Sequence, residues 1–190
     1  MSNHFLKSIF KEESFKPEEL KLVLNQFEPV EFKKNESLIH YGKVANYYFF
    51  LEEGFARSFV IDTSGNEVTT KFFSTNDIVI DWNSYFFKVP SQESIQAICN
   101  CKCWKITFAN FMKLFHINAF REVGRTRLIQ DFFELKSHSV SMIADQAKDR
   151  YLFLRKEKPD IICNVPLKYI ASYLGVTDTS LSRIRKDIKL

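Results

Sequence analysis

The sequence lacks the features that would place it in a membrane or outside the cell. No apolar run is long enough to cross a bilayer. The opening residues, MSNHFLKSIFKEE, lack the hydrophobic region of a secretory signal peptide. We therefore expect no membrane partner and a cytoplasmic protein whose four cysteines are reduced.

Patterns that carry catalysis are also missing. No G-x-S-x-G elbow and no Ser/His/Asp or Cys/His arrangement can be inferred from the sequence. The histidines stand singly, without the H-x-H pair that a cupin-type metal enzyme on a β-roll would need: His4, His40, His116 and His138. We expect no catalytic residue and no cofactor, and a metal enzyme is only a minor alternative.

Three cysteines form the one metal-like pattern. Cys99, Cys101 and Cys103 alternate along an expected strand, so they point to one face. A metal or redox sensor is one reading of this pattern. Iron–sulfur sets of the ferredoxin kind, however, use C-x₂-C loops that can wrap a metal. The spacing therefore favours small buried residues, and we expect no metal.

The most informative pattern lies in residues 165–190. Ile170 and Leu174 share one face of a first helix, and Gly175 follows where a turn needs a left-handed residue. Thr177 is a good N-cap for a second helix. The apolar positions of that helix recur at helical spacing: Leu181, Ile184 and Ile188. Two short helices joined by a glycine turn indicate a helix-turn-helix, whose partner is double-stranded DNA.

The second helix leaves a polar and basic side for DNA. Arg183 can offer a bidentate fork to guanine, and the remaining polar residues suit phosphates. The expected DNA-binding residues are Thr179, Ser180, Ser182, Arg183, Arg185, Lys186 and Lys189. Residues 165–190 hold five basic and two acidic residues, against a net charge of +4 for the whole chain. Basic charge is therefore focused on this segment.

Upstream, residues 28–107 change to aromatic and β-branched runs between turn signals. A short helix over 17–27 precedes them. The expected strands are Tyr47–Leu51, Phe55–Ile61, Val68–Phe73, Ile78–Ile80, Ile95–Cys99 and Trp104–Phe108, with a hairpin at Thr63–Asn66. Short strands at this spacing indicate a β-sandwich or barrel.

From Asn110 to about Lys158 the period is helical. A broad apolar stripe has two surfaces to cover, the barrel and the same helix of a second subunit. The expected dimer-interface residues are Phe120, Leu128, Phe132 and Leu135, with Ile129 and Phe133 beside them. We expect a hinge near Lys136–Ser141, followed by a second helix that begins around Val140 and ends at Pro159.

This order of elements resembles the CRP/FNR family of bacterial transcription regulators. The residues that carry the likeness are Gly42, Gly54-Phe55-Ala56-Arg57, Gly65, Glu67, Asp77, Ser84, Ala97, Asp149-Arg150-Tyr151 and IASYLGVTDTSLSRIRK at 170–186. The resemblance implies an α+β fold: an antiparallel β-roll or jelly roll over 1–116, a dimerisation helix and hinge over 117–138, and a helix-turn-helix domain over 139–190. It also implies a homodimer with DNA and RNA polymerase as partners.

The sequence departs from this family in the effector pocket. Where cyclic-nucleotide-binding members carry Gly-Glu, this chain has Ile80-Asp81, and Ser91-Gln92 replaces their Arg-Ser. Only Lys88 is basic within 82–96, so a cyclic phosphate would lack its cation. The degenerate pocket comprises Ile80, Asp81, Trp82, Ser84, Ser91 and Gln92. It is either filled by aromatic side chains or open to a different small effector, and a cyclic-nucleotide-responsive regulator is the alternative.

Overall fold

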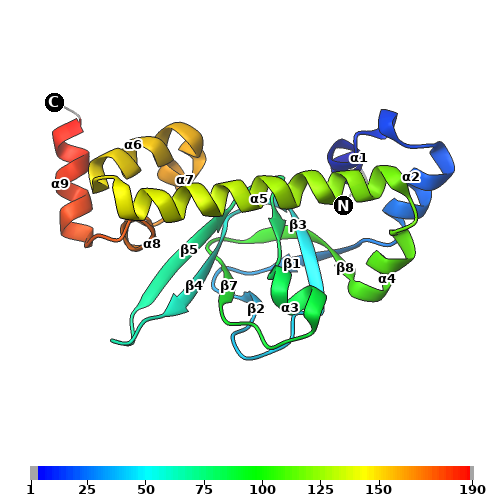
Figure 1. Cartoon of the computed structure of the whole chain (residues 1–190), viewed down its shortest axis with the longest axis horizontal. Coiled ribbons are helices and arrows are strands. Elements are labelled where there is room, and N and C mark those ends of the chain that lie inside the picture. Colours follow the sequence, from blue (N-terminus) through cyan, green and yellow to red (C-terminus); the bar gives the residue numbers. More distant parts are fainter. Residues whose placement is uncertain (1–3, 189–190) are drawn as a thin grey trace.

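Two four-stranded antiparallel sheets form the N-terminal half of the protein (Figure 1). The structure, a computed structural model, describes residues 4–188. The first sheet has the order β1 (Glu28–Phe32), β8 (Cys101–Thr107), β3 (Tyr47–Glu53) and β6 (Ile78–Val79). The second has the order β2 (Ser37–Ile39), β7 (Ser94–Ala97), β4 (Ala56–Ile61) and β5 (Glu67–Phe73). This arrangement confirms the predicted α+β fold with an N-terminal β-roll.

The predicted hairpin joins β4 to β5. The Asp62 carboxylate accepts hydrogen bonds from the backbone N–H groups of Ser64 and Asn66, each at 2.8 Å. Gly65 has a φ of +83°, which glycine adopts without a steric penalty. Ile61 then pairs with Glu67 across the turn. Local turn chemistry therefore fixes the register of this hairpin.

Two apolar cores hold the roll together. One lies between the sheets and contains Leu51, Phe73 and Ile95. The other lies against the first sheet, where short helices cover it: α1 (His4–Phe10), η1 (Glu12–Ser14), α2 (Pro17–Leu24), α3 (Trp82–Phe87) and α4 (Phe108–Leu114). This second core is rich in aromatic rings, including Phe10 and Phe50, and it also receives the first turn of the long helix.

The long helix α5 (Asn118–Ala144) runs along the whole roll (Figure 1). It passes without a break through the segment where we predicted a hinge, so that prediction is wrong. The Ser139 and Ser141 hydroxyls donate to the carbonyls of Leu135 and His138, which satisfies them within the helix. The chain leaves helical geometry only at Asp145, and the next helix begins at Ala147 rather than near Val140.

Four short helices follow and form the C-terminal unit: α6 (Ala147–Glu157), α7 (Pro159–Asn164), α8 (Leu167–Tyr173) and α9 (Asp178–Ile188). Pro159 ends α6 as expected and also starts α7. Gly175 has a φ of +67°, and the Ser180 N–H donates to the Thr177 hydroxyl at 3.2 Å. The turn and the N-cap of the helix-turn-helix are therefore as predicted.

The C-terminal unit packs on the edge strand β5 through α8. The Ser172 hydroxyl accepts the Thr69 N–H at 2.8 Å and donates to the Glu67 carbonyl at 3.2 Å. Beside this contact, the fully buried Arg57 guanidinium lies 3.7 Å from the Tyr169 ring centroid and pairs with the Glu67 carboxylate. The roll and the helix-turn-helix therefore share a specific polar junction. Within residues 4–188, no helix combines the length and the apolar character needed to cross a membrane.

Candidate nucleic-acid interface and effector cavity

Helix α9 packs one face inward and presents the other to solvent at one end of the molecule (Figure 1). Leu181 is fully buried against α8, in a core that contains Ile170 and Leu174. The outward face carries four of the predicted DNA-binding residues, all exposed: Thr179, Ser182, Arg183 and Lys186. The inward apolar face therefore sets which side chains are available to a partner.

The remaining predicted DNA-binding residues differ in position. Ser180 is half-buried, and its hydroxyl lies 3.0 Å from that of Thr177, so it belongs to the cap. Arg185 is half-buried on the flank of α9, and Lys189 lies outside the described residues. Within residues 4–188, no ion pair engages Arg183, Arg185 or Lys186.

The predicted effector pocket begins at the N-terminus of α3, where Asp81 is the N-cap. Its carboxylate accepts the Ser84 N–H at 3.0 Å and the Ser91 hydroxyl at 2.6 Å. The buried Ser84 hydroxyl in turn accepts the Ala45 N–H at 2.8 Å and donates to the Val89 carbonyl at 2.6 Å. Asp81 and Ser91, which stand where cyclic-nucleotide-binding members carry Glu and Arg, are therefore joined by a hydrogen bond from the Ser91 hydroxyl to the Asp81 carboxylate.

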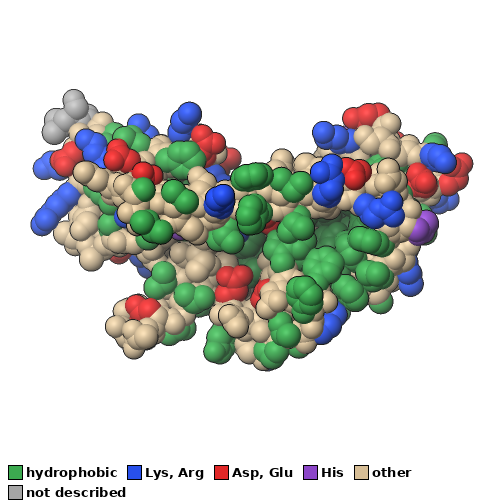
Figure 2. Space-filling view, viewed as in Figure 1, with side chains coloured by type: hydrophobic (Ala, Val, Ile, Leu, Met, Phe, Trp, Pro, Cys, Tyr) green, Lys and Arg blue, Asp and Glu red, His purple; other side chains and the backbone are tan. Residues whose placement is uncertain are grey.

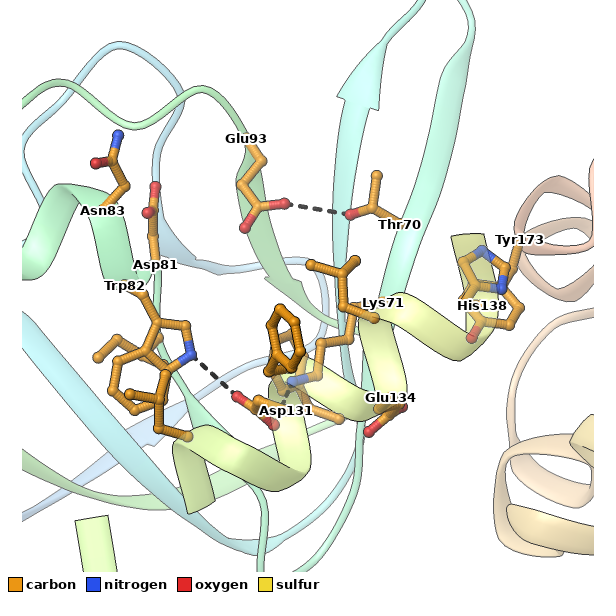
Figure 3. A pocket seen from close by; sticks show the side chains of 15 residues that line it. Thr70, Lys71, Asp81, Trp82, Asn83, Glu93, Asp131, Glu134, His138 and Tyr173 are labelled. Carbon is orange, nitrogen blue, oxygen red and sulfur yellow. Dashed lines mark hydrogen bonds and ion pairs between the residues drawn. The ribbon is translucent and has the colours of Figure 1, made fainter. Parts of the chain in front are cut away.

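A cavity of about 390 Å³ lies between β5, α3 and α5 (Figure 3). Of the residues predicted for the pocket, Ile80, Asp81 and Trp82 line this cavity, whereas Ser84 and Ser91 are buried and bond to the Asp81 carboxylate through the Ser84 N–H and the Ser91 hydroxyl. Gln92 is not among its lining residues. Aromatic and aliphatic side chains form one wall: Phe73, Trp82, Leu128, Phe132 and Leu135. Aromatic residues therefore narrow this cavity.

The cavity is rich in carboxylates. Besides Asp81 it is lined by Glu93, Asp131 and Glu134, which sequence reasoning missed. Among the described residues that line it, Lys71 alone is a lysine or arginine. Its ammonium lies 2.8 Å from an Asp131 oxygen, and the Trp82 indole N–H donates to the other oxygen at 3.0 Å.

Two of these carboxylates have distinct partners. Glu134 forms an ion pair with Lys158. Glu93 accepts hydrogen bonds from the hydroxyls of Ser58 and Thr70. Burial raises the pKa of Glu93, and its hydrogen bond from Ser58 opposes that rise. Such a lining disfavours an anionic ligand.

Two stacked rings close the cavity toward the C-terminal unit. His138 of α5 and Tyr173 of α8 stack with ring centroids 4.1 Å apart and planes 9° from parallel. Burial lowers the pKa of His138, and the charge of Arg150 lowers it further, while Glu134 raises it. The cavity therefore touches the first helix of the helix-turn-helix directly.

The four residues predicted for a dimer interface do not share one environment. Leu128, Phe132 and Leu135 are 46%, 57% and 62% exposed, but Phe120 is only 3% exposed and packs in the core of the roll. Figure 2 shows hydrophobic side chains gathered along α5 and beside it. Ile129 and Phe133, 40% and 61% exposed, widen this apolar face.

The three cysteines do not share one strand as predicted, because Cys99 lies in the turn between β7 and β8 and only Cys101 and Cys103 alternate along β8. Cys101 and Cys103 are buried, and Cys99 is half-buried. Burial raises the pKa of Cys101 to about 12, which leaves little reactive thiolate at neutral pH. Within residues 4–188, no group of three or more His, Cys, Asp or Glu side chains is arranged to hold a metal.

A β-roll, a long helix and a helix-turn-helix follow one another along the chain, and this order of elements is the fold of CRP/FNR transcription regulators. Residues 29–118 match the family model described as "Cyclic nucleotide-binding domain". No curated protein matches the chain.

Solved structures similar to the chain include FixK2 from Bradyrhizobium japonicum, with a TM-score of 0.73 and 16% identity over 86% of this chain and 84% of that one. A CooA mutant from Carboxydothermus hydrogenoformans has a TM-score of 0.70 and 18% identity, over 88% of this chain and 78% of that one. The c-di-GMP-responsive regulator CLP from Xanthomonas campestris has a TM-score of 0.70 and 12% identity, over 92% of both chains. At these identities the likeness shows the fold.

Proposed function

We propose that this protein is a homodimeric, sequence-specific DNA-binding transcription regulator whose effector cavity no longer suits a cyclic nucleotide. The observation that carries the proposal is the outward face of α9. A helix-turn-helix with a buried core leaves Thr179, Arg183 and Lys186 exposed at one end of the molecule, and no ion pair within residues 4–188 engages either basic side chain. Such a helix can enter a major groove with these side chains toward the bases and phosphates.

The roles within α9 follow from position. Arg183 lies on the exposed face one turn after Thr179, so it is placed to read a base edge. Arg185 and Lys186 lie toward the far end of α9 and suit phosphates, and Lys189 follows them in the sequence with the same proposed role. We also propose RNA polymerase as a further partner, because the resemblance to CRP/FNR regulators implies it.

The dimer is proposed through the exposed apolar face of α5. Leu128, Phe132 and Leu135 leave large apolar surfaces in water, and Phe120 takes no part because the roll buries it. A contiguous apolar face of this kind marks an interaction site. Two copies joined there would place two recognition helices about 34–36 Å apart on one side of a duplex.

Binding-site selection with random duplexes tests the DNA-binding role. We expect a palindromic motif, and Arg183→Ala should weaken the specific complex by about 1–3 kcal/mol and relax one base pair of each half-site. Lys186→Ala should weaken all sequences alike and lower the salt slope by about one ion. Lys21→Ala, exposed on α2 far from α9, is the matched control and should change neither. A motif identical for wild type and Arg183→Ala would remove the base-reading role.

Cyclic nucleotides are the second candidate effector, because residues 29–118 match their binding family. Lys71 could supply a cation, but it is already paired with Asp131. Four carboxylates also line the same cavity: Asp81, Glu93, Asp131 and Glu134. We therefore expect no appreciable binding of cyclic AMP or cyclic GMP. Calorimetry that found sub-millimolar affinity would favour this alternative.

A further inference from the structure

We propose that the cavity between β5, α3 and α5 binds an organic cation, a ligand that joins a positively charged nitrogen to an apolar body. This inference rests on the proposed function, since it names the effector class of the regulator. It reverses the charge that the resemblance to cyclic-nucleotide-binding members implies.

Two of the four carboxylates that line the cavity have no ion-pair partner within residues 4–188. Asp131 and Glu134 each pair with a lysine, Lys71 and Lys158. Asp81 and Glu93 take part in no ion pair within residues 4–188, and their bonded partners are neutral hydroxyl and N–H groups. Partly buried carboxylates are costly without a cation. A cationic ligand would supply the missing charge.

The cavity already accommodates one alkylammonium group, that of the Lys71 side chain. The Lys71 side chain crosses from β5 to Asp131 on α5, and its Nζ lies 5.0 Å from the Phe73 ring centroid. A carboxylate with an aromatic face is a favourable environment for an ammonium group. Trp82 and Phe132 offer further aromatic surface in the same cavity as Asp81 and Glu93.

Size and lining distinguish an organic cation from a metal ion. The cavity holds about 390 Å³ and is walled on the α5 side by Leu128, Phe132 and Leu135. Apolar walls with a few polar groups are typical of sites for small organic molecules. Within residues 4–188, no cluster suited to a metal is present.

The same cavity reaches the DNA-binding unit. His138 of α5 and Tyr173 of α8 both line it and stack on each other. A ligand that contacts these rings would bind with different affinity when α8 takes different positions. Such a difference in affinity is the condition for coupling ligand binding to DNA binding. The organic cation is therefore inferred to act as a regulator of DNA binding.

Three probes with one shared body test the ligand class by calorimetry on the full chain near neutral pH: 2-phenylethylammonium, 2-phenylethanol and 3-phenylpropionate. We expect saturable binding of the ammonium, with the alcohol and the carboxylate at least about tenfold weaker. Equal binding of the alcohol, tighter binding of the carboxylate or of cyclic AMP, or no saturable ammonium binding up to about 10 mM overturns the inference.

Two conservative variants locate the site. Glu93→Gln and Asp81→Asn each keep hydrogen-bonding capacity, and asparagine still caps a helix. Each should weaken ammonium binding at least about tenfold, because a charge-assisted contact is lost. Glu18→Gln, exposed on α2, should leave it unchanged. Thermal unfolding verifies that each variant is folded, and a folded Glu93→Gln and Asp81→Asn pair with wild-type affinity would contradict the assignment.

Gel retardation on the selected duplex separates this inference from the proposed function. We expect the ammonium probe to change the DNA affinity of wild type at least about threefold and to leave that of Glu93→Gln unchanged. A protein that binds its duplex but ignores the ammonium overturns the ligand class alone. A protein that binds the ammonium but no duplex overturns the proposed function and leaves the ligand class standing.

Discussion

The two halves of α5 contain similar apolar residues but place them in opposite environments. In the first half, Phe120 lies 5.9 Å from Phe10 and 5.5 Å from Phe111, measured between ring centroids, and it is buried. From Leu128 onward, in the part of α5 that we call its second half, the large apolar residues lie 40–89% exposed: Leu128, Ile129, Phe132, Phe133, Leu135, Val140, Met142 and Ile143. One half belongs to the core of the roll, and the other offers an uncovered face.

This contrast shows that an apolar stripe in the sequence predicts only part of a helix's environment. Helical periodicity identifies which residues share a side, but not what covers that side. Phe120 is one part of a stripe whose other members, including Phe132, are left to a cavity or a partner. Substitutions in the two halves should therefore affect different measured quantities.

The largest effect is expected in the buried half. Phe120→Ala should lower the free energy of unfolding by about 3–5 kcal/mol, because it removes an aromatic ring from a packed core. Urea unfolding at a fixed protein concentration measures this. Phe87→Ala, at a residue that is 75% exposed on α3, is the control and should cost below about 0.5 kcal/mol. Equal costs for the two would place Phe120 outside the core.

In the exposed half, Leu128→Glu should separate the dimer with little change in the fold of each subunit. A carboxylate buried without a partner at the interface should weaken dimerisation by at least about 2 kcal/mol, or roughly thirtyfold. Sedimentation equilibrium measures the dissociation constant, and circular dichroism verifies the helical content. Gln130→Glu, exposed on the same helix, should leave the dimer intact. A wild-type protein that is monomeric at micromolar concentration contradicts the proposal.

A smaller effect is expected at the junction between the roll and α8. Ser172→Ala leaves the Thr69 N–H without its acceptor and should cost about 0.5–1.5 kcal/mol. Hydrogen exchange should become faster at the Thr69 amide, whereas the amides between β3 and β8 should keep their protection. Ser182→Ala, exposed on α9, is the matched control. Unchanged exchange at Thr69 would show that the junction opens freely in the wild type.

The smallest effect concerns pH at the same junction. Burial and Arg150 lower the pKa of His138 below its ordinary 6.5, against the opposing charge of Glu134. As the pH falls, His138 therefore takes up a proton in the unfolded chain before it does so in the folded one. The stability that the neutral imidazole contributes is complete above pH 6.5 and is lost as the pH falls from 6.5 toward the pKa of His138 in the folded protein. Thermal unfolding of His138→Gln should show a weaker loss below pH 6.5 than wild type. His40→Gln, exposed on the roll, should keep the wild-type slope.

The sequence by itself determined the elements whose signals are local. The β4–β5 hairpin follows from Asp62 and Gly65, and the helix-turn-helix follows from Gly175, Thr177 and the spacing of Leu181. Glycine at positive φ and a hydroxyl N-cap act within a few residues, so the chain encodes them directly. The expected strands from Tyr47 to Ile80 match β3 to β6 within two residues, because aromatic and β-branched runs are also a local signal. The last two expected strands are displaced: β7 ends at Ala97 rather than Cys99, and β8 is Cys101–Thr107 with Phe108 in α4. The strands β1 and β2 were not predicted, because β1 contains Pro29 with only two half-buried apolar side chains besides, and β2 has only three residues.

Only the tertiary structure decided which residues meet. The predicted hinge is wrong because α5 continues through Lys136–Ser141 to Ala144, and neither glycine nor proline interrupts residues 136–144. The effector cavity was predicted around α3, but its charge depends on Lys71 and Asp131, which are sixty residues apart and meet only when β5 packs beside α5. The burial of Phe120 and the stacking of His138 on Tyr173 are also set by how whole elements pack. Such contacts have no local sequence period, because their partners come from elements that only the folded chain brings together.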